Sequence, residues 1–299
     1  MSINRVASID LGSNSFLLLI SERDDQGQLC VIEDICLVTQ LAQGVQKHKF
    51  FHKDALERAN KAFEHFFEKI KYYGVSNIKV VSTSAARDVT NKQEFLDLGL
   101  KYNFHIQIIS GEKEAELSFL GATFDQEHID ESFVLDIGGG STEFIYKQSH
   151  GLFAKSIDMG AVRLREMFIT GYPIKKSEGE DLRGYIRKLL KENFSKENFP
   201  KKMLAVAGTP VTLAGVIQAI EFNENKIHGF RITLNDLNLM THRLSKMDLN
   251  EIKLLKGMDE KRAHVIYAGA SILYECLEYF NLPDLKVSTK GLRYGLALR

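Results

Sequence analysis

The chain has 299 residues, 44% hydrophobic and 26% charged, which is usual for a globular protein long enough for two domains. The 39 Lys and Arg residues balance the 39 Asp and Glu residues, so the overall charge favours neither a nucleic-acid polymer nor a membrane as partner. No apolar run reaches the roughly 20 residues of a membrane span, and no secretory signal is recognisable. Cys30, Cys36 and Cys276 lack zinc-site spacing, so we expect reduced thiols in a cytoplasmic protein.

The first half of the chain alternates strand-like and helix-like patterns. In chain order, strands are predicted at residues 5–10, 16–21, 30–41, 77–84 and 105–110, and helices at 53–74, 87–102 and 112–125. The first strands are joined by short polar turns, which indicates antiparallel pairing. The later strands alternate with helices, so a mixed α/β sheet is predicted.

The second half starts in the same way, with two strands around a glycine turn at residues 132–147. A strand at 203–208 and helices at 210–220, 235–246 and 262–280 follow. When Asp136 is aligned with Asp10, Gly138 falls on Gly12 and Ser141 on Ser15, and the flanking apolar strands also match. We therefore predict two domains of related topology, residues 1–123 and 124–285.

Each of the two matched turns joins an acid to glycines and small polar side chains. The residues concerned are Asp10, Gly12, Ser13, Asn14 and Ser15 in the first turn and Asp136, Gly138, Gly139, Gly140, Ser141 and Thr142 in the second. Glycines permit positive φ and let backbone N–H groups approach a ligand closely. A carboxylate beside a phosphate needs a hard cation such as Mg²⁺ between them. For either turn alone, the alternative is a solvated hairpin.

A third candidate anion site lies at the end of the strand at 203–208. Thr209 is the expected cap of the next helix, Pro210 its first residue, and the helix N-terminus would face an anion. The alternative is a plain connection between strand and helix. Arg87 follows a Ser- and Ala-rich turn, where its guanidinium could grip phosphate oxygens or simply be exposed in a first helical turn.

Two charged stretches complete the candidates. In ISGEKEAELSF, one glutamate among Glu112, Glu114 and Glu116 could orient or deprotonate a water, although acids are also favoured at a helix N-terminus by the dipole alone. The segment GVQKHKFFHK, residues 44–53, is basic and aromatic. It could attract a polyanion or be a solvated turn.

Five motifs in this order, SIDLGSNSF, STSAARD, ISGEKEAEL, VLDIGGGSTEF and AVAGT, resemble the exopolyphosphatase and guanosine-pentaphosphate phosphohydrolase family. RAHVIYAGASILY and STKGLRYGLALR resemble its later motifs, so the match spans essentially the whole chain. The resemblance implies an α/β protein of two ribonuclease-H-like (actin-like ATPase) domains around a central cleft, each a mixed sheet flanked by helices. It also implies that residues 286–299 return to the first domain.

The same resemblance implies Mg²⁺-dependent release of terminal phosphate from inorganic polyphosphate or guanosine pentaphosphate. Asp10, Asp136 and Glu143 match the acids that hold the metal, and Asp136 and Glu143 are also expected to serve catalysis. Glu114 matches the glutamate that activates water, and Arg87 an arginine for the substrate phosphate. The expected substrate-binding residues are Gly12, Ser13, Asn14, Ser15, Gly138, Gly139, Gly140, Ser141, Gly208 and Thr209.

The sequence also departs from the family pattern. Lys113 stands where the family often has an acid, and Glu116 where it often has Arg. The chain lacks the C-terminal helical extension of long members, so a preference for long polymers has no support from this feature. Two other functions stay open: an ATPase or small-molecule kinase of the same superfamily, and a non-catalytic alarmone- or polyphosphate-binding sensor. Whether the chain forms a homodimer is also open.

Overall fold

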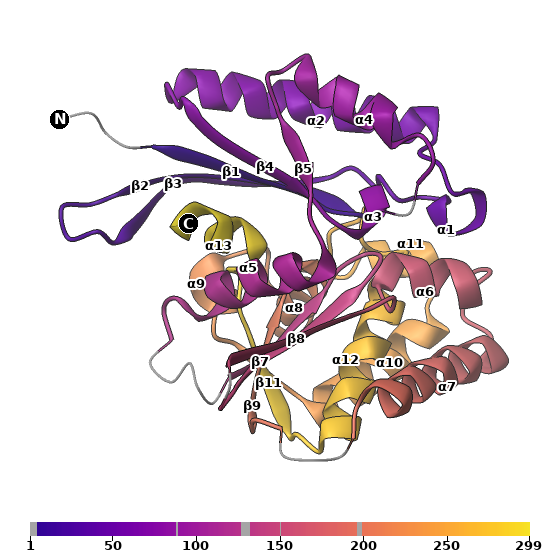
Figure 1. Cartoon of the computed structure of the whole chain (residues 1–299). Helices are drawn as coiled ribbons and strands as arrows, with labels where there is room; N and C mark the ends of the chain where they lie inside the picture. Colours follow the sequence, from indigo (N-terminus) through magenta and orange to yellow (C-terminus); the bar gives the residue numbers. More distant parts are fainter. Residues whose placement is uncertain (1–4, 88, 127–131, 150, 196–198) are drawn as a thin grey trace. The chain divides into compact units, whose positions relative to one another are not determined.

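The computed structural model describes residues 5–87, 89–126, 132–149, 151–195 and 199–299, and the chain divides into two compact units (Figure 1). Unit 1 comprises Met1–Gly121 and Leu292–Arg299, and unit 2 comprises Ala122–Gly291. The domain boundaries expected after residues 123 and 285 stay predictions, because compact packing alone does not define a domain that folds by itself.

Unit 1 contains a five-stranded mixed sheet in the order β3-β2-β1-β4-β5. Its strands are β1 (Val6–Leu11), β2 (Ser15–Arg23), β3 (Leu29–Val38), β4 (Asn77–Ser82) and β5 (Ile106–Ile108). Its helices are α1 (Val45–His48), α2 (Lys53–Tyr72), α3 (Ser84–Arg87), α4 (Lys92–Leu100), α13 (Leu292–Leu298) and α5 (Gly111–Thr123), near whose end unit 2 begins. β1 pairs antiparallel with β2 and parallel with β4, as the mixed-sheet prediction requires.

Helices cover both faces of this sheet. α2 and α4 lie on one face (Figure 1), where Phe63 of α2 and Phe95 of α4 pack against Phe16 of β2 in a buried aromatic core. On the other face, α5 and α13 form a smaller core over β4. A Cβ at Gly295 of α13 would lie 1.9 Å from the carbonyl oxygen of Leu117, so only glycine allows these two helices to approach this closely.

The predicted helix at residues 87–102 is shorter: α4 covers Lys92–Leu100, and Arg87 is instead the last residue of the short helix α3. The chain between them is held by the segment before α2. Asn91 Oδ1 accepts the N–H of Phe51 at 2.8 Å, and Asn91 Nδ2 donates to the Phe51 carbonyl at 3.1 Å. Thr90 N–H donates to the Lys49 carbonyl at 2.8 Å. These bonds take the backbone away from the helical ladder, which explains the break.

Unit 2 contains a six-stranded sheet in the order β10-β11-β9-β6-β7-β8. Its strands are β6 (Ser132–Ile137), β7 (Thr142–Gln148), β8 (Gly151–Ile157), β9 (Lys202–Val206), β10 (Arg231–Thr233) and β11 (Asp284–Val287). Its helices are α6 (Ala161–Phe168), α7 (Lys176–Asn193), α8 (Gly208–Gln218), α9 (Glu224–Ile227), α10 (Leu234–Lys246), α11 (Leu249–Lys253) and α12 (Ile266–Phe280). The apolar helix α12 is buried along most of its length and packs against α6, α7, α8 and α10.

The two units repeat one topology. The order β3-β2-β1-β4-β5 in unit 1 corresponds to β8-β7-β6-β9-β11 in unit 2, with β10 added at the edge. Each pair has the same sense: the first hairpin is antiparallel, and the central strand pairs in parallel with the next strand along the sheet. The predicted α/β class, with two ribonuclease-H-like mixed sheets flanked by helices, is confirmed.

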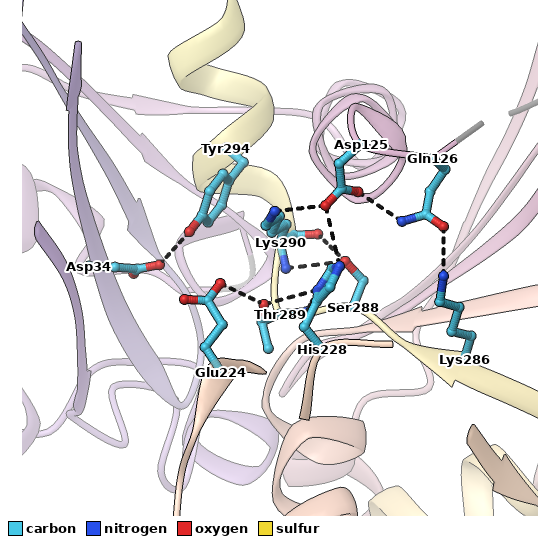
Figure 2. Close-up of polar contacts among 10 residues, drawn as sticks. All are labelled: Asp34, Asp125, Gln126, Glu224, His228, Lys286, Ser288, Thr289, Lys290 and Tyr294. Atoms are coloured by element: carbon cyan, nitrogen blue, oxygen red, sulfur yellow. Dashed lines mark hydrogen bonds and ion pairs between the residues drawn. The ribbon is translucent and has the colours of Figure 1, made fainter. Parts of the chain in front are cut away.

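The segments at the two ends of unit 2 are bound to each other (Figure 2). Lys290 Nζ donates to Asp125 Oδ2 at 2.7 Å, and His228 Nε2 lies 3.3 Å from the same oxygen. Lys286 Nζ donates to Gln126 Oε1 at 3.0 Å. Burial alone would raise the pKa of Asp125, but hydrogen bonds from His228, Lys290 and Gln126 outweigh it and hold that pKa well below its usual range.

The expected absence of a membrane span and of disulfides can be checked in the described residues. Among them, no helix is both long and apolar enough to cross a membrane. None of the three cysteines, all of which lie in the described ranges, forms a disulfide: Cys30 and Cys36 are exposed on β3, and Cys276 is buried in α12. The cytoplasmic location stays a prediction.

Replacing Asp125 by Asn tests the charge that binds the two ends of unit 2 to each other. Because its pKa is lowered on folding, the ionised carboxylate stabilises the fold above its ordinary pKa of 3.8, and this contribution is lost as the pH falls further. We expect D125N to lower the free energy of unfolding by about 1.5–3 kcal/mol at pH 7, as for the loss of a hydrogen bond to a charged group. The difference from wild type should stay nearly constant from pH 7 down to about that ordinary pKa and shrink as the pH falls below it. Urea unfolding followed by circular dichroism at several pH values measures it.

A matched control is E180Q, which removes a carboxylate from the exposed i,i+4 pair Lys176–Glu180 on α7. Exposed pairs contribute little, so E180Q should leave stability nearly unchanged. If D125N were as stable as wild type at pH 7, the Asp125 network would contribute nothing to the fold.

Candidate active site

The matched turns of the sequence form the same hairpin in both units. Asp10 is the last residue but one of β1, and Asp136 is the last but one of β6. In unit 1 the N–H of Gly12 donates to the Ser15 carbonyl at 3.0 Å, and in unit 2 the N–H of Gly138 donates to the Ser141 carbonyl at 3.0 Å. The sequence repeat is therefore a repeat of backbone geometry.

In unit 2 the glycine loop is held against the N-terminus of α6. The Gly138 carbonyl accepts from Ala161 N–H at 3.0 Å, and the Gly139 carbonyl accepts from the next two N–H groups at 2.8 and 3.0 Å. Arg163 Nε donates to the Gly140 carbonyl at 2.7 Å. Since a trans peptide is planar, its N–H points opposite to its C=O, so the N–H groups that follow these three carbonyls point away from α6. Such successive donors are typical of an anion-binding loop.

The loop glycines do not adopt the positive φ angles that glycine permits, and the glycine that matters for packing is Gly160, where the loop approaches α6 closely. Among the described residues, the glycines with positive φ do not include Gly12, Gly138, Gly139 or Gly140, so the freedom that glycine permits is not used there. A Cβ at Gly160, just before α6, would lie 2.3 Å from the Gly139 carbonyl carbon. A side chain at position 160 would therefore push the loop away from the helix.

Two acids and a serine stand in one row across the sheet of unit 2. Asp136 of β6 is directly opposite Glu143 of β7, and Glu143 is directly opposite Ser156 of β8. Side chains in such register share a face, with Cβ atoms about 4.5–5.5 Å apart. Glu143 is fully buried, Asp136 is nearly so, and Ser156 Oγ donates to Glu143 Oε1 at 2.6 Å.

The donor set of this row fits one mode of Mg²⁺ binding. Among the described residues, no three His, Cys, Asp or Glu side chains are arranged as a complete protein metal site. Mg²⁺ is commonly held by one or two carboxylates together with substrate phosphates and water. The neighbouring carboxylates Asp136 and Glu143 suit that mode. Asp10 is half-buried on β1 in unit 1.

In unit 1 the structure brings Arg87 and Glu114 together. Arg87 Nη1, at the end of α3, donates to Glu114 Oε2 at 3.0 Å and to the Ile109 carbonyl at 2.9 Å. The Glu114 side chain is 8% exposed, so the guanidinium offsets the cost of burying a carboxylate. Ser13 of the first loop is joined to α3 by a buried contact between its Oγ and Ser84 Oγ, at 3.1 Å. The loop, Arg87 and Glu114 thus belong to one connected network.

The other glutamates of α5 face different surroundings. Glu112 is exposed. Glu116 accepts from Lys113 Nζ at 2.8 Å and also pairs with Arg299. Of the three glutamates, Glu114 is the one that is buried, which distinguishes it as a candidate base.

The third loop differs from its predicted form. The N-cap of α8 is Ala207, with φ of 75°, and Gly208 is the first helical residue, so Thr209 is not the cap and Pro210 is not the first residue of the helix. Thr209 is buried against α12, where a Cβ at Gly269 would lie 2.6 Å from Thr209 Oγ1. Gly208 lies against the Arg262 guanidinium, which occupies the space that a Cβ would take.

Sequence reasoning missed Ser84, Ser156 and Arg163. Ser156 lies on β8, a strand that was not predicted because residues 151–157 lack a clear two-residue alternation. Arg163 lies in a short helix, and its role depends on the glycine loop more than twenty positions earlier in the chain. A signal for β8 was available in the repeat itself, because β3 in unit 1 holds the corresponding place.

Known proteins align with the full length of this chain. The bifunctional 3-dehydroquinate synthase/phosphatase of Fusobacterium nucleatum is 34% identical over 313 residues, covering 98% of this chain and 46% of that protein. The chain therefore spans less than half of that relative. Exopolyphosphatase 2 of Mycobacterium tuberculosis is 30% identical over 315 residues, covering 100% of this chain and 99% of that protein.

Solved structures give the same picture. The crystal structure of the Aquifex aeolicus member of the Ppx/GppA protein family superposes with a TM-score of 0.81 at 28% identity, covering 99% of this chain and 97% of that one. Residues 19–299 match the model of the Ppx/GppA phosphatase family. The repeated hairpins, the strand order and this match over nearly the whole chain show that the protein belongs to the Ppx/GppA phosphatase family.

Proposed function

We propose that this protein is a Mg²⁺-dependent phosphohydrolase that releases the terminal phosphate of inorganic polyphosphate or guanosine pentaphosphate. The observation that carries the proposal is the buried Glu114 carboxylate, held by Arg87 and connected through α3 to a loop of the repeated hairpin. The name of the Mycobacterium tuberculosis relative, exopolyphosphatase 2, supports polyphosphate as a substrate.

Phosphate binding is assigned to the loops and to Arg87. In unit 2, the N–H groups of Gly139, Gly140 and Ser141 that point away from α6 would donate to phosphate oxygens. In unit 1, the residues from Gly12 to Ser15 would do the same. A guanidinium has five N–H donors, so Arg87 can hold Glu114 through Nη1 and still donate to a phosphate oxygen. Gly208 and Thr209 stay candidates for contact with the more distant part of a nucleotide substrate.

Glu114 is proposed to activate the attacking water. Its carboxylate would take one proton from the water, whose oxygen then forms a bond to the terminal phosphorus. The bridging P–O bond breaks, and the shortened chain leaves with the electron pair of that bond. Most of the rate enhancement in such reactions comes from positioning and charge stabilisation. The bond from Arg87 fixes the direction from which the Glu114 carboxylate can take this proton.

Asp136 and Glu143 would hold Mg²⁺, with Asp10 as the third predicted acid. When bound, Mg²⁺ supplies positive charge that offsets the negative charge of the phosphates. Ser156 would keep the buried Glu143 carboxylate in one orientation through its 2.6 Å hydrogen bond.

Replacing Glu114 by Gln tests the assigned base. E114Q keeps the size of the side chain but cannot accept a proton, so turnover should fall about 100-fold or more. Substrate affinity should change little. Phosphate release measures turnover, and isothermal titration of the substrate measures affinity.

The matched control is E112Q, an exposed position on the same helix, which should retain full turnover. Full turnover by E114Q would remove Glu114 from the role of base, whereas an equal loss in both variants would indicate a general effect on α5.

A substrate panel tests the proposed function as a whole. Phosphate release is measured from tripolyphosphate, long-chain polyphosphate, guanosine pentaphosphate and ATP, with Mg²⁺ and with EDTA. We expect release from at least one of the polyphosphates or guanosine pentaphosphate, lost in EDTA, and much less from ATP. Selective turnover of ATP would favour the ATPase or kinase alternative. Tight binding without release under Mg²⁺ would favour a sensor.

A further inference from the structure

We infer that the basic segment, residues 44–53, binds the part of a long polyphosphate chain that lies beyond its terminal phosphate. The inference rests on the proposed function, and it names long-chain polyphosphate as the substrate class. The segment has the sequence GVQKHKFFHK, and it comprises α1, the loop that leads into α2 and the first residue of α2, Lys53.

The backbone just before the basic segment is fastened to the first phosphate loop. The N–H groups of Thr39 and Gln40 donate to the Asn14 carbonyl at 3.0 and 2.9 Å, and the Ala42 N–H donates to the Ser13 carbonyl at 2.9 Å. These bonds use the carbonyl groups of the loop, so the N–H groups that follow those carbonyls stay directed away from this contact, where a ligand could bind them. They also fix where the basic segment starts relative to the loop.

The other part of the basic segment is fastened next to Arg87. Thr90 donates to the Lys49 carbonyl through both its N–H, at 2.8 Å, and its Oγ1, at 3.1 Å. Asn91 makes two further bonds to the backbone of Phe51. Thr90 is three residues after Arg87, a length of chain that spans at most about 11 Å. Figure 1 places α1 and α3 at the same end of the unit 1 sheet.

The basic segment is a local concentration of positive charge in a chain whose formal net charge is zero. Lys47, His48, Lys49 and Lys53 are exposed, and residues 44–53 contain no acid. Among the described residues, no ion pair uses Lys47, Lys49 or Lys53. No acid of the described residues neutralises these three lysines through an ion pair, so their charges can attract a polyanion.

Ring packing keeps this surface compact. His48 and His52 meet edge to face at 5.1 Å between ring centroids, and Phe50 lies 4.8 Å from His52. Phe51 is buried in the core of unit 1 and so attaches the segment to that core. Because the backbone of the segment is already fixed, binding a repeating anion has to order only the exposed lysine side chains, which limits its cost.

Long-chain polyphosphate fits this arrangement better than a short substrate. An exposed cation contributes about 0.2–1 kcal/mol per contact, so several phosphates are needed for a measurable effect. Tripolyphosphate has too few groups to occupy the terminal site and the basic segment together. The inference therefore predicts a contribution that grows with chain length and falls with salt.

The test is the double variant K47E/K49E. For long-chain polyphosphate, we expect KM to rise roughly five- to tenfold, the equivalent of about 1–1.4 kcal/mol. For tripolyphosphate, kcat/KM should change less than about twofold, since only the terminal site is used. The salt dependence of KM for the long chain should become less steep by about one to two in log–log slope, as expected when two cationic contacts are lost.

The control K71E/K101E makes the same change of charge at exposed lysines at the far ends of α2 and α4. It should leave KM for the long chain within about twofold of wild type, because its charges are far from Arg87. Equal effects of the two double variants, or equal losses on the long and short substrates, would overturn the inference.

A binding measurement separates this inference from the proposed function. Fluorescence polarisation of labelled long-chain polyphosphate in EDTA reports binding without turnover. If the wild type releases no phosphate from any substrate, the proposed function fails. Weaker binding by K47E/K49E than by K71E/K101E would still support polyphosphate binding by the basic segment. Equal binding by both variants contradicts the proposed binding of polyphosphate by the basic segment, whether or not the protein releases phosphate.

Discussion

A carboxylate buried to 8% exposure has to be balanced by a cation, and in unit 1 that requirement joins three separate pieces of chain. Glu114 lies in the first turn of α5, and Arg87 reaches it from the end of α3. α3 is in turn fixed to the first loop through Ser84 and Ser13. Removing either member of the Arg87–Glu114 pair would leave a buried charge or an orphaned guanidinium, so the two residues act as a unit.

A second constraint is the direction of peptide groups in the repeated hairpin. In unit 2 the N-terminus of α6 and Arg163 take up the carbonyls of the glycine loop, and planarity then sets the direction of the N–H groups that follow. The glycine that makes this possible is Gly160, at the helix, rather than one with unusual angles in the loop. The loop's donors are thus fixed before any anion binds, which reduces the cost of binding one.

The sequence was most informative where the signal was local or repeated. The alternation of apolar residues and the two Asp-x-Gly turns predicted the hairpins, and their repetition predicted two related sheets. Short elements such as β10 and β11, of three and four residues, carry too little pattern to be recognised. The helix predicted at 87–102 begins only at Lys92 because Asn91 binds the distant Phe51, an interaction that no local propensity reports.

Side-chain partners in the site were harder to predict than its members. Arg87 was expected to face a phosphate, and its bond to Glu114, 27 positions later, depends on how β5 returns the chain to the sheet. The cap predicted at Thr209 was wrong because α8 starts at Gly208 and Thr209 packs against α12 instead. Residue type therefore indicated the chemistry, and tertiary packing decided which atoms meet.

The most direct test of the central claim is a double-mutant cycle in kcat/KM for phosphate release, with R87K and E114Q. If Arg87 acts largely by holding Glu114, the double variant should be at least about fivefold more active than the product of the two single losses, a coupling of about 1 kcal/mol. Losses that multiply would contradict the account, because Arg87 and Glu114 would then act independently.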